Sequence, residues 1–197
     1  MKKTKLVLAS ASPRRLDLLE MLGLFDLTVI PARTEAPLDP SLPVPEAVAR
    51  VALSKARDTA ARAPEGSLVL GADTVVSLGD RILGKPRDRA EASAMLHALS
   101  GRKHTVYTGM ALVQGSREIR DTAAADVWFR PMEDREIDAY IATGSPLDKA
   151  GAYGAQDMAA LFVERIEGEF FTVVGLPMCG LGKLLAAFGI RLWSENG

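Results

Sequence analysis

The spacing of apolar residues along the chain predicts short strands interspersed with amphipathic helices. Compact apolar runs predict strands, and apolar residues recurring every three or four positions predict helices. The expected strands are 5–9, 27–30, 68–76, 103–113, 118–129 and 161–166, and the expected helices are 13–22, 45–62, 88–99, 134–142 and 177–188. The two strands around 114–116 are expected to pair as a hairpin. The pattern therefore predicts an α/β or α+β fold with a mixed sheet, not a pure Rossmann pattern.

Local signals mark where the helices begin and end. Ser12 and Pro13 suit the cap and the first position of a helix, and Gly23 suits its end. Asp88 and Glu91 have the spacing of a capping box. A proline-rich loop is expected at 31–45, and the glycine-containing stretch at 144–157 reads as an ordered functional loop or a plain connector.

Composition limits the class of protein. The chain has 197 residues, 48% of them hydrophobic, which favours a single domain over 1–197, with room for two lobes. The formal net charge of -1 argues against a general nucleic-acid binder. No apolar run approaches the roughly 20 residues of a membrane helix. The apolar part of the N-terminus, at 6–9, is too short for a signal peptide, so a cytoplasmic protein is expected.

Cysteine and histidine content gives little support for a zinc site. The chain has two histidines and one cysteine, Cys179, which lies in an apolar stretch. An inert buried thiol in a reducing compartment is the expected state of Cys179. His104 is expected to hydrogen-bond within a strand or hairpin, because no nucleophile arrangement surrounds it. Carboxylate ligation of Mg²⁺ or Mn²⁺ is the better metal chemistry.

A first chemical constellation lies where a predicted strand gives way to a helix. Ser10, Ser12, Arg14 and Arg15 gather there. A helix N-terminus offers N–H groups and partial positive charge to a phosphate, and a guanidinium matches phosphate oxygens. A capped helix with two exposed arginines is the equally simple alternative.

Two further segments carry isolated charges. Asp73 interrupts an apolar strand, where an unpaired carboxylate is costly, so it is paired, at a strand end or at a metal. Residues 79–86 nearly fit a P-loop, but Pro86 lacks the hydroxyl that binds magnesium, and no long helix starts from Lys85. A P-loop enzyme is therefore rejected, and Lys85 remains a candidate phosphate contact. Glu35 and Lys55 are unremarkable by themselves.

Six segments together resemble the Maf family of septum-formation-associated nucleotide pyrophosphatases. They are LASASPRR at 8–15, GADTVV at 71–76, LGKP at 83–86, SGRKHTVYTG at 100–109, GSPLDKAGAYGAQ at 144–156 and FFTVVGLP at 170–177. The resemblance covers nearly the whole chain. It implies an α/β fold with two lobes, a mixed sheet flanked by helices and a cleft for the nucleotide between the lobes, similar to the inosine triphosphate pyrophosphatase fold.

The resemblance also implies an activity and its requirements. It implies hydrolysis of nucleoside triphosphates between the α- and β-phosphates, giving the monophosphate and pyrophosphate, with a divalent cation such as Mg²⁺ or Mn²⁺. The expected substrates are dTTP and UTP, with modified pyrimidine nucleotides as further ones. Homodimers are common in the family, and no nucleic acid or membrane partner is expected. The alternative is a nucleotide-binding regulator of cell division without essential catalysis.

Matching positions carry the roles that the resemblance implies. The triphosphate cradle would contain Arg14, Arg15, Lys55 and Lys85, with Lys85 counted in the catalytic set. Glu35 and Asp73 would hold the metal and activate water, with Asp73 as the base. Ser10 and Ser12 would face phosphate.

Base recognition would come from Thr74, Gln156 and Arg15, as in the branch that prefers dTTP and UTP. One departure is Asp157, where that branch usually has glycine. If the backbone there needs a positive φ, aspartate adopts it less easily than glycine, and Asp157 adds negative charge near the base pocket.

Overall fold

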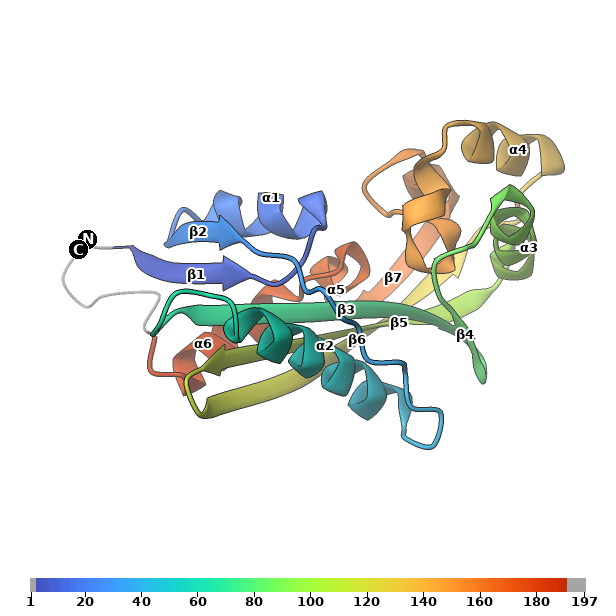
Figure 1. Cartoon of the computed structure of the whole chain (residues 1–197). Coiled ribbons are helices and arrows are strands. Elements are labelled where there is room, and N and C mark those ends of the chain that lie inside the picture. The colour runs from blue at the N-terminus through green and yellow to red at the C-terminus, as the bar shows by residue number, and fades with distance from the viewer. Residues whose placement is uncertain (1–2, 191–197) are drawn as a thin grey trace. The chain divides into compact units, whose positions relative to one another are not determined.

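The computed structural model describes residues 3–190, which form one mixed sheet with helices against it (Figure 1). The strands are β1 (Thr4–Leu8), β2 (Phe25–Val29), β3 (Leu68–Leu78), β4 (Arg81–Leu83), β5 (Lys103–Gln114), β6 (Arg117–Phe129) and β7 (Val163–Gly168). The α-helices are α1 (Pro13–Leu22), α2 (Val44–Ala60), α3 (Arg89–Leu99), α4 (Asp134–Ala142), α5 (Phe170–Val174) and α6 (Met178–Ala187).

Most expected elements are confirmed. The last predicted strand begins two residues too early, because Met158–Phe162 forms a 3-10 helix and β7 begins at Val163. The sequence pattern does not predict α5, and three-residue β4 is too short to show a period. Ser12 precedes α1 as expected, but its side chain makes no capping hydrogen bond.

The sheet combines parallel and antiparallel pairs, which confirms the predicted mixed sheet. Its order is β2-β1-β3-β5-β6-β7, and β4 pairs with β3. β1 pairs in parallel with both β2 and β3. β4 and β7 are antiparallel to their partners β3 and β6.

The chain divides into two compact units, and β3, β5 and β6 each contribute residues to both. The first unit contains 1–73, 108–123 and 175–197, and the second contains 74–107 and 124–174, in both cases as far as the structure describes them. The single domain expected from length stays a prediction.

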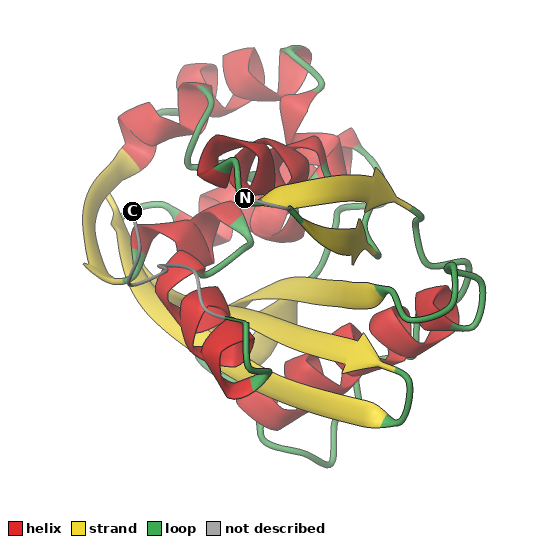
Figure 2. Ribbon diagram, turned by 90° about the vertical axis from the view of Figure 1, so that its left-hand side faces the viewer, coloured by secondary structure: helices red, strands yellow, loops and turns green. Residues whose placement is uncertain are grey.

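In the first unit, α2 lies directly on the sheet. A Cβ at Gly71 of β3 would fall 2.2 Å from the carbonyl oxygen of Ala52, and one at Gly109 of β5 would fall 2.7 Å from that of Val48. Only glycine allows a helix backbone to come this close to a strand. Small residues of α2, including Ala52 and Ala56, complete the packing with buried valines of the sheet. β1 and β2 form the parallel pair that starts beside the label N in Figure 2.

The second unit has an aromatic core. Tyr140, Phe129 and Phe162 are buried there with apolar residues of α3, α4 and β5. Their rings meet edge to face, Tyr140 with Phe162 at 5.7 Å between centroids and Phe129 with Phe162 at 6.3 Å. This core includes buried residues of the 3-10 helices Ala150–Ala152 and Met158–Phe162, which lie between α4 and β7 with a further one at Ser145–Asp148.

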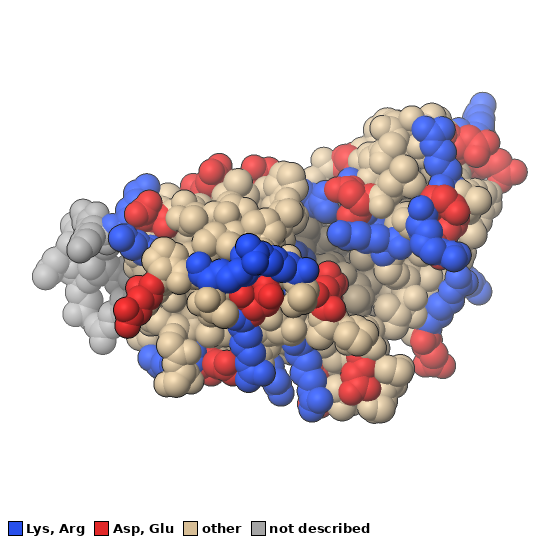
Figure 3. Space-filling view, in the orientation of Figure 1, with Lys and Arg blue, Asp and Glu red and all other residues tan. Residues whose placement is uncertain are grey.

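The surface corrects one expectation. Cys179 is exposed at the start of α6, so the prediction of a buried thiol was wrong. An apolar stretch that forms an amphipathic helix also has an outer face, and Cys179 lies on it. Acidic and basic side chains are interspersed on the face shown in Figure 3, in keeping with the net charge of -1. Among the described residues, no helix is long and apolar enough to cross a membrane.

Candidate active site

The candidate site of the first unit forms where β1 and β2 end and β3 continues. Leu8, the last residue of β1, pairs with Leu70 of β3 and with Val29, the last residue of β2. Ser10 therefore follows the end of β1, and Asp73 lies three residues beyond Leu70. In open α/β sheets, ligands bind at the carboxyl ends of strands where the strand order reverses. The order β2-β1-β3 gives such a reversal here.

Lys55 of α2 joins the two acidic candidates. Its Nζ lies 2.7 Å from Oδ1 of Asp73 and 3.2 Å from Oε1 of Glu35. The side chains of Lys55 and Asp73 are each 13% exposed, whereas that of Glu35 is 63% exposed. Two carboxylates far apart in the sequence thus meet one ammonium group, and of the two, Glu35 has the more solvated side chain.

Arg15 is buried beside this cluster and donates hydrogen bonds to protein oxygens. Its Nε donates to the carbonyl of Gly175 at 2.8 Å, and its NH1 donates to the carbonyl of Ala72 at 2.9 Å and to Oγ of Ser10 at 3.0 Å. Burial lowers the pKa of Arg15, and the charges of Asp73 and Glu35 oppose that shift. Arginine nevertheless keeps its charge in proteins.

Arg15 therefore links three of the sequence motifs. Sequence reasoning found the motifs at 8–15, 71–76 and 170–177 separately, but it did not identify Gly175 as an acceptor. Ser12 and Arg14 lie half-buried at the start of α1, and the Ser12 amide donates to Oγ of Ser10 at 3.2 Å. The charge of Arg14 contributes to lowering the pKa of Arg15, so both cations belong to one electrostatic cluster.

The donor set fits a magnesium-type cation shared with a substrate. No group of three or more His, Cys, Asp or Glu side chains suited to a metal occurs among residues 3–190. Mg²⁺ is commonly held by one or two carboxylates together with substrate phosphates and waters. Glu35 and Asp73 supply that number of carboxylates, while a structural zinc site would need four protein ligands.

The remaining candidates, Thr74, Lys85 and Gln156, belong to the second unit. Lys85 is exposed in the turn after β4, and Gln156 is exposed after the 3-10 helix Ala150–Ala152. The amide of Gly151 donates to the carbonyl of Gly84 at 3.0 Å, which joins the segment before Gln156 to the turn that carries Lys85. The roles of these three residues stay predictions.

Asp157 fits its position without a left-handed backbone. Its φ is −120°, so the concern about a positive φ does not apply. Its carboxylate accepts hydrogen bonds from the hydroxyls of Tyr140 and Ser145 and from the amide of Ala159, and Lys149 lies 3.7 Å away. The negative charge of Asp157 is therefore engaged in holding the loop before and after Gln156.

His104 makes the kind of contact expected of it. Its Nε2 lies 2.8 Å from the hydroxyl of Tyr153, and both side chains are buried. Burial lowers the pKa of His104 to about 4, so the ring is neutral near pH 7. The pair connects β5 with the segment that ends at Gln156, a link that separate motifs do not reveal.

Comparison with known proteins decides the family. A family model described as Maf-like protein matches residues 5–188. The chain belongs to the Maf family. A relative named dTTP/UTP pyrophosphatase from Moorella thermoacetica is 52% identical over 98% of this chain and 99% of its own length. Proteins of the same name from Methanosarcina mazei and Symbiobacterium thermophilum are 42% and 44% identical, over 98% and 96% of this chain and 98% and 97% of their own lengths.

Solved structures are more distantly similar to this Maf protein. One is titled nucleoside-triphosphatase / dITP/XTP pyrophosphatase, from Mycobacterium abscessus. It is 18% identical, covers 66% of this chain and 76% of its own, and has a TM-score of 0.44.

Proposed function

We propose that this Maf protein hydrolyses nucleoside triphosphates, dTTP and UTP in particular, to the monophosphate and pyrophosphate. Relatives that match almost the full chain carry the name dTTP/UTP pyrophosphatase at 42–52% identity. The observation that carries the proposal is the contact of one ammonium group, Lys55, with both Glu35 and Asp73. A protein that only binds nucleotide has little need for two carboxylates beside one ammonium group.

Asp73 is the proposed base. Its carboxylate lies in a mostly buried position in β3, and Lys55 holds one of its oxygens in place. The other carboxylate oxygen is then the one that accepts the proton of the attacking water. A positioned general base contributes roughly 10²- to 10⁴-fold to a rate.

The cations of the first unit suit a triphosphate. Lys55, Arg14 and Arg15 bring positive charge to the carboxylates and would offset part of the phosphate charge. A divalent cation held by Glu35 and Asp73 would neutralise phosphate charge and polarise the phosphorus that water attacks. Most of the rate gain would come from positioning and electrostatic stabilisation by these groups.

Residues of the second unit complete the proposal. Lys85 would stabilise the leaving pyrophosphate, Ser10 and Ser12 of the first unit would face the phosphates, and Thr74 and Gln156 would contact the base together with Arg15. Modified pyrimidine nucleotides are proposed as further substrates, and a homodimer as the assembly. The cation would be Mg²⁺ or Mn²⁺.

Product analysis tests the proposal. The purified protein is incubated with dTTP, UTP and GTP, with and without Mg²⁺ or Mn²⁺, and pyrophosphate, orthophosphate and monophosphate are separated. We expect pyrophosphate and monophosphate in equal amounts, only with metal, and faster from dTTP and UTP. Release of orthophosphate one group at a time would indicate a phosphatase. Nucleotide binding without any product would indicate a nucleotide-binding regulator without catalysis.

A further inference from the structure

The loop between β2 and α2, which carries Glu35, is held along one side of α2. At its start, Oγ1 of Thr59 donates to the carbonyl of Ile30 at 3.1 Å, and NH2 of Arg62 donates to the carbonyl of Pro31 at 2.9 Å. These contacts fix the point at which the chain leaves the sheet. They do not reach the residues directly before Glu35.

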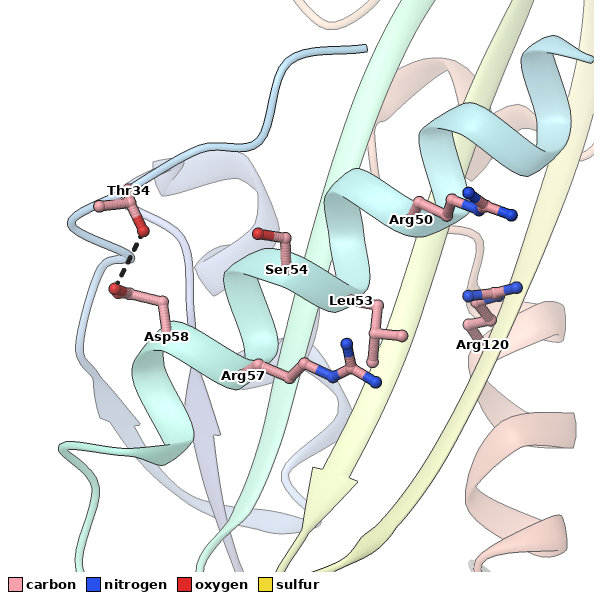
Figure 4. Close-up of a pocket in the computed structure, with 7 residues that line it drawn as sticks. All are labelled: Thr34, Arg50, Leu53, Ser54, Arg57, Asp58 and Arg120. Atoms are coloured by element: carbon pink, nitrogen blue, oxygen red, sulfur yellow. Dashed lines mark hydrogen bonds between the residues drawn. The ribbon is translucent and has the colours of Figure 1, made fainter. Parts of the chain in front are cut away.

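Asp58 holds the residues directly before Glu35. Its Oδ2 accepts from the amide of Arg33 at 2.8 Å, and its Oδ1 accepts from the hydroxyl of Thr34 at 3.1 Å, the bond drawn in Figure 4. Oδ2 also accepts from Arg62 at 2.7 Å. These hydrogen bonds, the backbone one first, lower the pKa of Asp58 and keep its carboxylate charged at neutral pH.

The spacing on α2 explains how one helix performs both tasks. Lys55, Asp58 and Thr59 stand at i, i+3 and i+4 of α2, positions that share one face of a helix, and Arg62 follows in the turn after α2. Lys55 meets the carboxylate of Glu35, and the next turn binds the backbone and hydroxyl of the two preceding residues. Helix α2 therefore contacts the loop at the consecutive residues 33–35.

The Glu35 side chain has little support of its own. It is 63% exposed, and its ion pair with Lys55 does little to fix the position of the Glu35 carboxylate. Solvent screens the pair, and two long side chains must be immobilised to form it. The placement of Glu35 therefore depends on its backbone. Asp58 supplies the backbone and hydroxyl contacts at the two residues before it.

We infer that Asp58 is a positioning residue that presents Glu35 to the divalent cation and does not itself touch metal or substrate. The inference rests on the proposed function, which makes Glu35 a metal ligand. Asp58 and Thr34 line a groove of about 650 Å³ together with Arg50, Leu53, Ser54, Arg57 and Arg120 (Figure 4). Lys55 and the two proposed metal ligands are not part of that lining, in keeping with an indirect role for Asp58.

The chain offers a matched control on the same helix. Glu46 and Arg50 form an i,i+4 pair at 2.8 Å, just as Asp58 and Arg62 do at 2.7 Å. Glu46→Gln removes an i,i+4 ion pair that is more exposed than that of Asp58 and Arg62, and it does not touch the loop. Asp58→Ala removes every acceptor, whereas Asp58→Asn keeps one oxygen that Thr34 or the Arg33 amide can use.

The experiment measures manganese binding to the nucleotide-free full-length protein by electron paramagnetic resonance, with Mn²⁺ alone as the probe. We expect Asp58→Ala to weaken binding about tenfold, as loss of a residue that orients a metal ligand does. Asp58→Asn should recover part of the loss, and Glu46→Gln should bind as wild type. Hydrogen exchange should rise at 33–35 in Asp58→Ala.

A double variant separates positioning from general damage. If Asp58 acts through Glu35, adding Asp58→Ala to Glu35→Gln weakens Mn²⁺ binding no further. Additive losses, wild-type binding by Asp58→Ala, or an equal loss in Glu46→Gln would overturn the inference. Failure of the proposed function appears separately, as wild-type protein that releases no pyrophosphate from dTTP, while faster exchange at 33–35 in Asp58→Ala still reports the hold of Asp58 on the loop.

Discussion

Replacing Gly71 with alanine tests whether the close packing of α2 on the sheet builds the site. The added Cβ would lie 2.2 Å from the carbonyl oxygen of Ala52 and 2.8 Å from the amide nitrogen of Ala56. Both are helix backbone atoms, so no side-chain rotation removes the collision. The 2.2 Å separation must grow by more than about 1 Å before ordinary van der Waals contact returns, so α2 must move away from β3.

That movement has a cost in stability and a cost at the site. Overpacking of this kind typically destabilises by about 1–3 kcal/mol, and each kcal/mol lowers the melting temperature of a chain this long by about 2–4 °C. Lys55 lies one helical turn after Ala52, and Asp73 lies two residues after Gly71. A displaced helix therefore lengthens the 2.7 Å contact between Lys55 and Asp73.

Thermal and urea denaturation with pyrophosphate release from dTTP measure the two effects. Gly84→Ala is the stability control, because its Cβ would meet nothing within 4 Å. We expect Gly71→Ala to melt several degrees lower and to lose turnover at temperatures where it stays folded. A Gly71→Ala protein that melts and turns over like wild type would refute the packing argument.

Four further predictions concern single side chains. Asp73→Asn should abolish most turnover yet keep the fold, and wild-type turnover by this variant would contradict the assignment of Asp73 as the base. Lys55→Met should raise the Mg²⁺ concentration that turnover requires. Metal titrations of pyrophosphate release check both variants. Because the pKa of His104 is about 4 in the folded chain and 6.5 for an unperturbed histidine, only the unfolded chain takes up a proton between these values, so stability falls as pH falls from 6.5 to 4. This contributes up to about 3 kcal/mol, and urea titrations of His104→Gln should show a flatter profile than wild type; parallel profiles would contradict the cause. Asp157→Gly should leave the backbone unstrained but release its hydroxyl partners, so hydrogen exchange across 145–159 should rise; unchanged exchange would show that the carboxylate does not hold the loop.

The elements with a clear period were predictable because burial of one face dictates their pattern. α2 repeats small and branched residues on its inner side, and β3 is apolar on both faces, so both were found from spacing alone. Asp73 stood out for the same reason, as a charge inside such a run. Short pieces such as β4 and the 3-10 helix at 158–162 have too few residues for a period.

Contacts between distant segments were not predictable from spacing. Nothing near Arg15 in the sequence indicates that the carbonyls of Ala72 and Gly175 bind its guanidinium. No motif in the sequence singles out Asp58, although it holds the loop before Glu35. The sequence left open whether Asp157 needs a positive φ, and only the fold reveals its extended backbone and hydroxyl partners.

The two proposed metal ligands differ in how they are held, and this difference separates their effects on cation affinity and on turnover. Asp73 is fixed in a central strand, mostly buried and bonded to Lys55, so its geometry changes little unless α2 or β3 moves. Glu35 is exposed on a loop whose position depends on α2. Changes to the loop should therefore alter cation affinity first, whereas changes at the contact between α2 and β3 should alter turnover even when the cation is saturating.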